Sequence, residues 1–228
     1  MNIYFVSIFP EIYKSFVSSS LIGKANQQWL VNFNFVNPRD YTNDKHNQID
    51  DELYGIWAGM LMKAKPMIDS IQDTVQNIKW DYQIVMLAPS KSFFDQKKAR
   101  DYTRLDNLIL ISGRYEWIDY RFEKFMKNKY NTKFQKVSLG KFVMMWGELA
   151  SMVVAESVIR LIPWVIKQES IANDSYSLEQ DMKNIEHPQY TRPRKVYGMW
   201  VPETLLSGDH QRIAEWKKQQ TKNLNDED

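Results

Sequence analysis

Three charged side chains crowd into six residues directly after an apolar run near the middle of the chain. The run covers residues 108–111, and Arg114, Glu116 and Asp119 follow it. An apolar run of strand length that breaks into glycine and charge is typical of the carboxyl end of a buried strand. Open α/β sheets bind ligands in the crevice beyond such strand ends. Residues 112–121 are therefore a candidate active-site loop.

Several common catalytic motifs are missing from the sequence. It contains no Gly-x-Gly-x-x-Gly fingerprint, no phosphate-binding P-loop and no Ser-centred nucleophile elbow. The three histidines, His46, His187 and His210, are scattered along the chain, so we expect no metal site. These absences argue against nicotinamide enzymes, kinases and hydrolases.

The composition is that of an ordinary globular protein. The 228 residues are 43% hydrophobic and 25% charged, with a net charge of +2 and no cysteine. A disulfide framework and a thiolate metal site are thereby excluded. No apolar run approaches the roughly 18 residues of a membrane span, and residues 1–10 do not form a signal peptide. We expect a soluble, cytoplasmic protein that does not associate with membranes.

Strand-like and helix-like segments alternate along the chain. The expected strands are 3–9, 30–36, 82–87, 108–111 and 134–137, and the expected helices are one from Glu11, then 65–78, 95–102, 147–162 and 209–221. Met152, Ala155, Val158 and Ile159 predict an amphipathic helix over 147–162. Residues 39–60 are expected to form a long loop, and 223–228 a frayed acidic tail. This pattern predicts an α/β fold with a mostly parallel sheet and a small C-terminal helical piece.

Short motifs recur from residue 3 to about 219 in one order that is familiar from a known family. They are Ile8-Phe9-Pro10-Glu11, Pro38-Arg39-Asp40-Tyr41-Thr42, Asp50-Asp51-x-x-Tyr54-Gly55, Gly59-Met60-Leu61-Met62, Gly113-Arg114-Tyr115-Glu116-x-Ile118-Asp119, Gly147-Glu148-Leu149, Asp174-Ser175, Tyr190-Thr191-Arg192-Pro193 and Leu205-Leu206-Ser207-Gly208-Asp209-His210. The chain resembles the bacterial tRNA (guanine-N1)-methyltransferases of the TrmD type, in the SPOUT superfamily. Each motif is weak alone, but together they cover nearly the whole chain.

The resemblance implies a fold, a reaction and partners. The fold would be a SPOUT-type, trefoil-knotted, parallel-sheet α/β domain (1–162), followed by an interdomain linker (163–193) and a short C-terminal helical tRNA-binding domain (194–228). The cofactor would be S-adenosyl-L-methionine, and the protein would be a homodimer with its active site at the subunit interface. The reaction would methylate N1 of the guanosine immediately 3′ of the anticodon in tRNA.

The resemblance also assigns roles to individual residues. The cofactor-binding positions would be Leu87, Pro89, Gly113, Tyr115, Glu116, Leu139, Gly140, Phe142, Met144, Trp146 and Gly147. Asp174 would be the general base that removes the N1 proton, and Arg160 would stabilise negative charge on guanine O6. Substrate contacts would come from His46, Asp50, Arg114 and Ser175.

Simpler interpretations stay open for the polar residues. Asp174 could be a helix N-cap, and Arg160 a surface charge or an ion-pair partner. Glu116 and Asp119 could be first-turn carboxylates of a helix, and His46 an ordinary loop residue. Further along the chain, Lys217, Lys218 and Lys222 could form a solvated helix face or contact tRNA phosphates.

Tryptophan stands where the family has glycine at Trp29, Trp57, Trp117, Trp146 and Trp164. The chain has 8 Gly and 8 Trp, so glycine is about half as frequent as its usual share of roughly 7%. We hypothesise that the gene uses UGA for glycine and that these codons were read as Trp. If these residues are truly tryptophan, we expect Trp146 to block the cofactor loop. The chain would then be a catalytically impaired RNA-binding relative; another alternative is methylation of a different RNA site.

Overall fold

A computed structural model describes residues 1–55, 59–171, 174–176 and 182–223. The chain divides into two compact units, Met1–Ile166 and Lys167–Asp228. Each unit is described by itself below. Among the described helices, none is both long enough and apolar enough to cross a membrane.

The first unit is built on a five-stranded sheet in which every neighbouring pair is parallel. The strand order is β2 (Asn32–Val36), β1 (Asn2–Val6), β6 (Asn107–Ile111), β5 (Tyr82–Leu87) and β8 (Phe134–Val137). The expected parallel α/β sheet is confirmed. The bounds of β5, β6 and β8 lie within one residue of the predicted ones.

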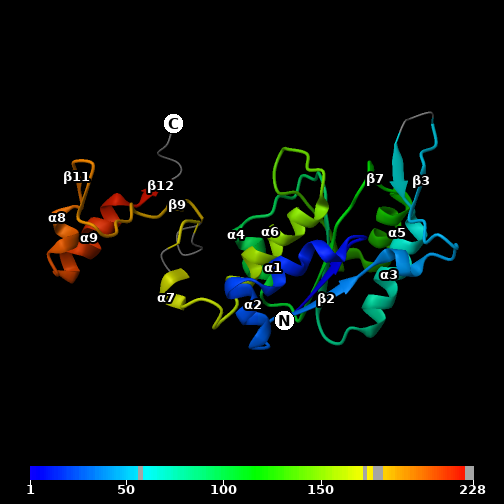
Figure 1. Cartoon of the computed structure of the whole chain (residues 1–228), viewed down its shortest axis with the longest axis horizontal. Helices are drawn as coiled ribbons and strands as arrows, with labels where there is room; N and C mark the ends of the chain where they lie inside the picture. The colour runs from blue at the N-terminus through cyan, green and yellow to red at the C-terminus, as the bar shows by residue number, and fades with distance from the viewer. Residues whose placement is uncertain (56–58, 172–173, 177–181, 224–228) are drawn as a thin grey trace. The chain divides into compact units, whose positions relative to one another are not determined.

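Helices cover both faces of this sheet (Figure 1). One face packs against α3 (Ala64–Asn77) and α5 (Tyr120–Tyr130), and the residues in contact form a continuous buried cluster. Side chains of a strand alternate between the two faces. Val6, Ile109 and Met86 therefore join that cluster, while Phe5 points to the other face and stacks on Tyr13 with ring centroids 4.1 Å apart.

The other face carries further helices of the unit. They are η1 (Pro10–Tyr13), α1 (Lys14–Ser18), α2 (Ser20–Gln27), α4 (Gln96–Tyr102) and α6 (Gly147–Ile159). Asp95 caps α4 by accepting a hydrogen bond from the Lys98 backbone N–H at 2.7 Å, at the start of the helix predicted over 95–102. The short η3 (Asn131–Lys133) leads into β8.

The prediction of a loop over residues 39–60 is wrong in part. The chain forms η2 (Pro38–Tyr41) and β3 (Asp50–Glu52) there, and β3 pairs antiparallel with β4 (Met60–Met62). β4 in turn pairs in parallel with β7 (Trp117–Ile118), which belongs to the candidate loop. Strands of two or three residues depend on pairing partners distant in sequence, so no local pattern indicates them.

The prediction for α6 is also corrected. The helix ends at Ile159 rather than 162, and its apolar residues are spread around it instead of being gathered on one side. Met152, expected in the core, is only half-buried, whereas Val154, Ala155 and Val158 are fully buried. Leu149 and Val153 remain 45% and 48% exposed. Apolar side chains therefore lie on the exposed side of α6 as well as on its buried side.

The second unit contains short elements. They are α7 (Gln168–Ile171), β9 (Asn184–Ile185), β10 (Lys195–Val196), β11 (Met199–Trp200), α8 (Glu203–Leu206), α9 (His210–Gln220) and β12 (Lys222–Asn223). The predicted final helix corresponds to α9, which Asp209 caps through the backbone N–H groups of Gln211 and Arg212. The predicted acidic tail lies beyond the described residues, apart from Asn223.

Three tryptophans adopt a backbone conformation that favours glycine. The φ angles of Trp29, Trp80 and Trp164 are 60°, 69° and 75°, and their side chains are 81%, 76% and 86% exposed. The left-handed region costs a residue with a Cβ atom about 1–2 kcal/mol. Trp146 has an ordinary φ of −126°, and Trp57 lies outside the described residues. Trp80 was not among the suspected positions.

Candidate active site

A cavity of about 410 Å³ opens at the carboxyl edge of the parallel sheet. Since parallel strands end at the same edge, the loops after β5, β6 and β8 meet there. The wall consists of Leu87, Ala88, Pro89, Gly113, Tyr115, Glu116, Trp117, Lys136, Val137, Ser138, Leu139, Gly140, Phe142, Val143, Met144, Met145, Trp146, Gly147 and Ala150. The volume lies within the range of roughly 300–1,000 Å³ that small-molecule sites occupy.

The structure brings all eleven predicted cofactor-binding residues together on this wall. The indole of Trp146 forms part of the wall and leaves the cavity open. Sequence reasoning missed Lys136, Ser138, Val143 and Met145. Lys136 and Ser138 could have been found from their place at the end of β8, beside the other two strand ends.

Two of the wall's loops touch backbone to backbone. A Cβ atom on Gly147 would lie 2.8 Å from both the backbone N and the O of Gly113, and 3.0 Å from Ser112 Cα. Real Cβ atoms essentially never approach other atoms below 3.0 Å. The chain that enters α6 therefore passes directly against the loop after β6, and only glycine fits at residue 147.

Glu116 links the cavity to the neighbouring small sheet. Its backbone N–H donates to Met60 O at 3.2 Å, and its Oε2 accepts from the Met60 N–H at 2.6 Å. Gly59 precedes this contact with φ +123°, where a Cβ atom would collide with the Glu116 carboxylate. Glu116 is thus not a first-turn residue of a helix. Asp119 is the N-cap of α5, and hydrogen bonds and charge from Arg121 hold its carboxyl pKa below the usual value.

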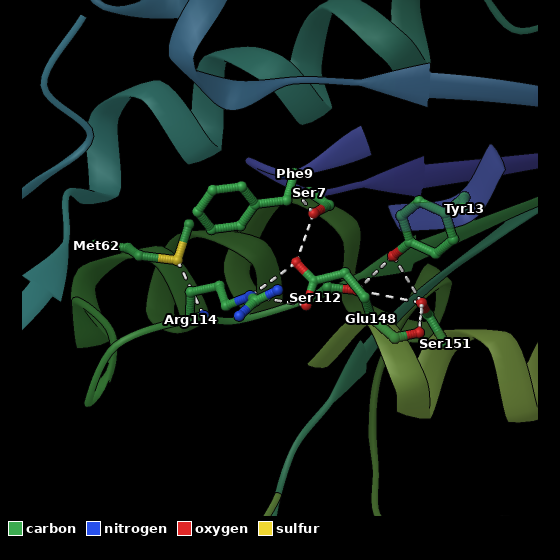
Figure 2. Close-up of polar contacts among 8 residues, drawn as sticks. All are labelled: Ser7, Phe9, Tyr13, Met62, Ser112, Arg114, Glu148 and Ser151. Carbon is green, nitrogen blue, oxygen red and sulfur yellow. Dashed lines mark hydrogen bonds and ion pairs between the residues drawn. The ribbon is translucent and has the colours of Figure 1, made fainter. Parts of the chain in front are cut away.

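Arg114 and Glu148 form a buried ion pair behind the cavity wall (Figure 2). Arg114 Nε donates to Glu148 Oε1 at 3.0 Å and lies 2.8 Å from Oε2. Oε2 accepts no hydrogen bond within the described residues, so it interacts with Arg114 by charge. The Arg114 guanidinium also lies over the rings of Phe9 and Trp146, 4.7 and 4.8 Å from their centroids.

A neutral hydrogen-bond network continues from this ion pair (Figure 2). The Tyr13 hydroxyl is 3.0 Å from Ser112 Oγ and 2.8 Å from Ser151 Oγ. Ser151 Oγ also donates to the Glu148 backbone carbonyl at 2.8 Å. Burial raises the pKa of Tyr13 well above its usual value, so the phenol stays neutral at all physiological pH values. The network joins η1, the loop after β6 and α6.

The two predicted catalytic residues do not line the cavity of their own chain. Arg160 is the half-buried C-cap residue of α6. It follows Gly147 by 13 residues, and at 1.5 Å per residue the two ends of the helix are about 20 Å apart. Asp174 belongs to the second unit, where its carbonyl accepts from Asn184 Nδ2 at 3.0 Å. The N-cap alternative for Asp174 involves residues 177–181, which are not described.

Of the four predicted substrate-binding residues, three belong to the first unit and Ser175 belongs to the second. His46 is exposed in the loop before β3, and Asp50 begins β3 opposite Met62. Arg114 is engaged by Glu148, and Ser175 Oγ in the second unit accepts from the Glu186 N–H at 3.0 Å. None of the four lines the cavity.

Possible metal ligands are dispersed in the part of the chain that the structure describes. No group of three or more His, Cys, Asp or Glu side chains there is placed to hold a metal ion. Asp51 and Glu52 line a separate cavity of about 730 Å³ together with Lys63 and Arg121. Asp51 is paired with Lys63 at 3.6 Å, and Arg121 is paired with Asp119.

Comparison with known proteins gives the family. The model of the family described as tRNA (Guanine-1)-methyltransferase TrmD matches residues 1–226. The tRNA (guanine-N(1)-)-methyltransferase of Mycoplasmopsis synoviae (strain 53) is 40% identical over 217 residues, covering 95% of this chain and 90% of the relative. The protein of the same name from Bacillus subtilis (strain 168) is 38% identical over 222 residues, covering 97% and 87%. That of Clostridium botulinum (strain Alaska E43 / Type E3) is 40% identical over 225 residues, covering 98% and 89%. The chain belongs to the tRNA (guanine-1)-methyltransferase family of the TrmD type.

Proposed function

We propose that this chain uses S-adenosyl-L-methionine to methylate N1 of the guanosine immediately 3′ of the anticodon in tRNA. The observation that carries the proposal is the convergence of the eleven predicted cofactor-binding residues on one cavity. Those positions were assigned from sequence resemblance alone, and they come from three loops distant in sequence.

The residues of the cavity fit the chemistry of S-adenosylmethionine. Leu87, Leu139 and Phe142 offer apolar surface for the adenine ring, and the glycines allow the backbone to approach a ligand closely. The Glu116 carboxylate on the wall suits a ligand that carries a positively charged sulfonium. When bound, the cofactor supplies an electrophilic methyl group.

The protein supplies the acid–base chemistry in this proposal. Guanine N1 carries a proton and is a poor nucleophile until that proton leaves. Asp174 would take the N1 proton as the methyl group passes from sulfur to N1 and the sulfonium leaves as a neutral thioether, and Arg160 would stabilise the negative charge that develops on O6. Positioning of N1 against the methyl group contributes much of the remaining acceleration.

We propose that the active site is completed by a second copy of the chain. Arg160 is separated from the start of α6 at the cavity by the length of the helix, about 20 Å. A homodimer would let Arg160 and Asp174 of one subunit act at the cavity of the other. The exposed apolar side chains of Leu149 and Val153 on α6 favour an interface on that helix.

Two further parts of the proposal concern the fold and the tRNA. The close passage of Gly147 past Gly113 supports a trefoil knot, in which the chain entering α6 is threaded through the earlier loops.

In the second unit, the exposed Lys217 and Lys218 in the last turn of α9 support phosphate contacts with tRNA.

Methyl transfer to an unmodified tRNA transcript tests the proposal. The protein is incubated with S-adenosylmethionine and the transcript, and the RNA is then digested and analysed by mass spectrometry. The expected product is 1-methylguanosine. Cofactor binding without any methylated nucleoside would indicate a non-catalytic relative, and a different methylated nucleoside would indicate another RNA site; either result overturns the proposal.

A further inference from the structure

We propose that Glu148 is a positioning residue that, through Arg114, holds two walls of the cofactor cavity in register. The inference rests on the proposed function, since it concerns binding of S-adenosylmethionine. Glu148 does not line the cavity and touches no group within it. Its effect is transmitted through its partners.

The burial of Glu148 demands an explanation. The side chain is fully buried, at 0% exposure, and a carboxylate in that environment is costly unless charge and hydrogen bonds compensate it. The compensation comes from two other segments of the chain (Figure 2). Ser7 Oγ, just after β1, donates to Oε1 at 2.6 Å, and Arg114, after β6, supplies the positive charge at 2.8 Å from Oε2.

The ion pair sits one residue beyond the closest crossing of the cavity wall. Glu148 follows Gly147, Arg114 follows Gly113, and the two glycines contact each other through their backbones. Both glycines line the cavity. An attraction between the two following side chains therefore presses one wall segment onto the other. The ion pair is the charged contact between the two segments beside this crossing.

Arg114 also contacts a third residue of the cavity wall, Trp146. Its guanidinium lies over the ring of Trp146, which lines the cavity, and over the ring of Phe9. The contacts of Ser7 and Arg114 with the Glu148 carboxylate do not themselves include the side chain of residue 146.

The neutral hydrogen-bond network allows the positioning role of Glu148 to be tested without unfolding the protein. Ser151 and Tyr13 bind the same segments through uncharged hydrogen bonds that do not involve the Glu148 carboxylate. Loss of the carboxylate charge is therefore expected to loosen the crossing while the segments stay packed.

The test is the variant Glu148→Gln, which keeps the shape of the side chain and removes its charge. Calorimetry with S-adenosylmethionine is expected to give a Kd raised about tenfold, the scale of one lost charge-assisted hydrogen bond. With saturating cofactor, kcat for tRNA methylation should stay within about twofold, because no group that touches substrate has changed. Arg114→Gln combined with Glu148→Gln should raise Kd no more than either single change.

Asn107→Ala is the matched control. Asn107 is 2% exposed and donates to Lys79 O and Asp81 O at the opposite end of β6. It should lower the melting temperature and leave Kd unchanged. If Glu148→Gln does not fold, Ser7→Ala removes a hydrogen bond to the carboxylate without removing charge, and its Kd should rise about threefold.

The outcomes separate this inference from the proposed function. Failure of the wild-type protein to bind S-adenosylmethionine would overturn the proposed function. Tight binding by the wild type together with an unchanged Kd for Glu148→Gln and Ser7→Ala would overturn the inference alone. A fall in kcat with unchanged Kd would also overturn it.

Discussion

Gly147 packs against Gly113 so closely that a single methyl group on Gly147 would lie 2.8 Å from two backbone atoms of the other loop. Both residues line the cavity. Backbone atoms cannot rotate away as a side chain can, so the crossing depends on glycine. This contact sets the spacing between the loop after β6 and the start of α6.

The first prediction concerns this crossing. Gly147→Ala should lower the free energy of unfolding by about 1–3 kcal/mol, the usual cost of overpacking, and should weaken cofactor binding. Denaturant unfolding and calorimetry measure the two effects. Gly198→Ala is the control, since a Cβ atom there meets nothing within 4 Å and only backbone strain at φ +86° is added. An unchanged Kd for Gly147→Ala would refute the role of the crossing.

The second prediction concerns the general base. Asp174→Asn should bind S-adenosylmethionine normally, while its rate of methyl transfer falls by about 10²–10⁴, the typical contribution of a general base. Calorimetry and single-turnover kinetics separate binding from chemistry. Asp101→Asn on α4, which removes an exposed pair with Lys97, should change neither quantity. Retained turnover in Asp174→Asn would remove Asp174 as the base.

The third prediction concerns the subunit interface. Leu149 and Val153 lie one turn apart on α6, and both are about half exposed. Val153→Glu should convert a dimer into a monomer in analytical ultracentrifugation and abolish turnover, with the circular dichroism spectrum unchanged. Leu206→Glu in the second unit changes a residue of similar exposure and should leave the dimer intact. A Val153→Glu protein that remains dimeric would place the interface elsewhere.

The fourth prediction concerns the tryptophans. We expect UGA codons at Trp29, Trp57, Trp117, Trp146 and Trp164, and the left-handed backbone adds Trp80 to that set. UGG at these positions would contradict the recoding hypothesis.

The recoding hypothesis also predicts how Trp→Gly substitutions change the free energy of unfolding. Trp29→Gly, Trp80→Gly and Trp164→Gly should each raise the free energy of unfolding by about 1 kcal/mol, because glycine adopts positive φ without strain. Trp216→Gly should lower it, since that half-buried ring contacts His187 and Tyr190 with centroids 6.1 and 6.2 Å away. Denaturant unfolding of the four variants measures both the expected increases and the expected decrease in the free energy of unfolding.

The sequence pattern within a few residues was enough to predict several strand bounds and helix starts. β5 has the predicted bounds, because its apolar run over residues 84–87 is buried and ends at a proline turn. β8 also has the predicted bounds, although two half-buried polar residues stand at its centre. The Asp95 cap of α4 is equally local, since capping spans three residues. The grouping of the cofactor-loop residues came from family resemblance, and the parallel sheet gives it a physical basis because β5, β6 and β8 end at one edge.

The remainder depends on contacts between distant residues. The pairing of β4 with β7 joins segments about 56 residues apart, as does the Glu116–Met60 hydrogen bond. Arg114 is separated from Glu148 by 34 residues. From sequence, Arg114 was a candidate substrate contact, because nothing local reveals that a buried carboxylate already engages it. The left-handed φ of Trp80 is likewise invisible without the backbone.

The most direct test of the account is methyl transfer to a matched pair of tRNA transcripts. The two transcripts are identical except that one has guanosine and the other adenosine immediately 3′ of the anticodon. They are assayed with labelled S-adenosylmethionine, using the wild-type chain and the Trp146→Gly variant. The account predicts 1-methylguanosine in the first transcript and at least about a hundredfold lower rate with the second. Equal rates for both transcripts, or no transfer by either protein while the cofactor binds, would contradict it.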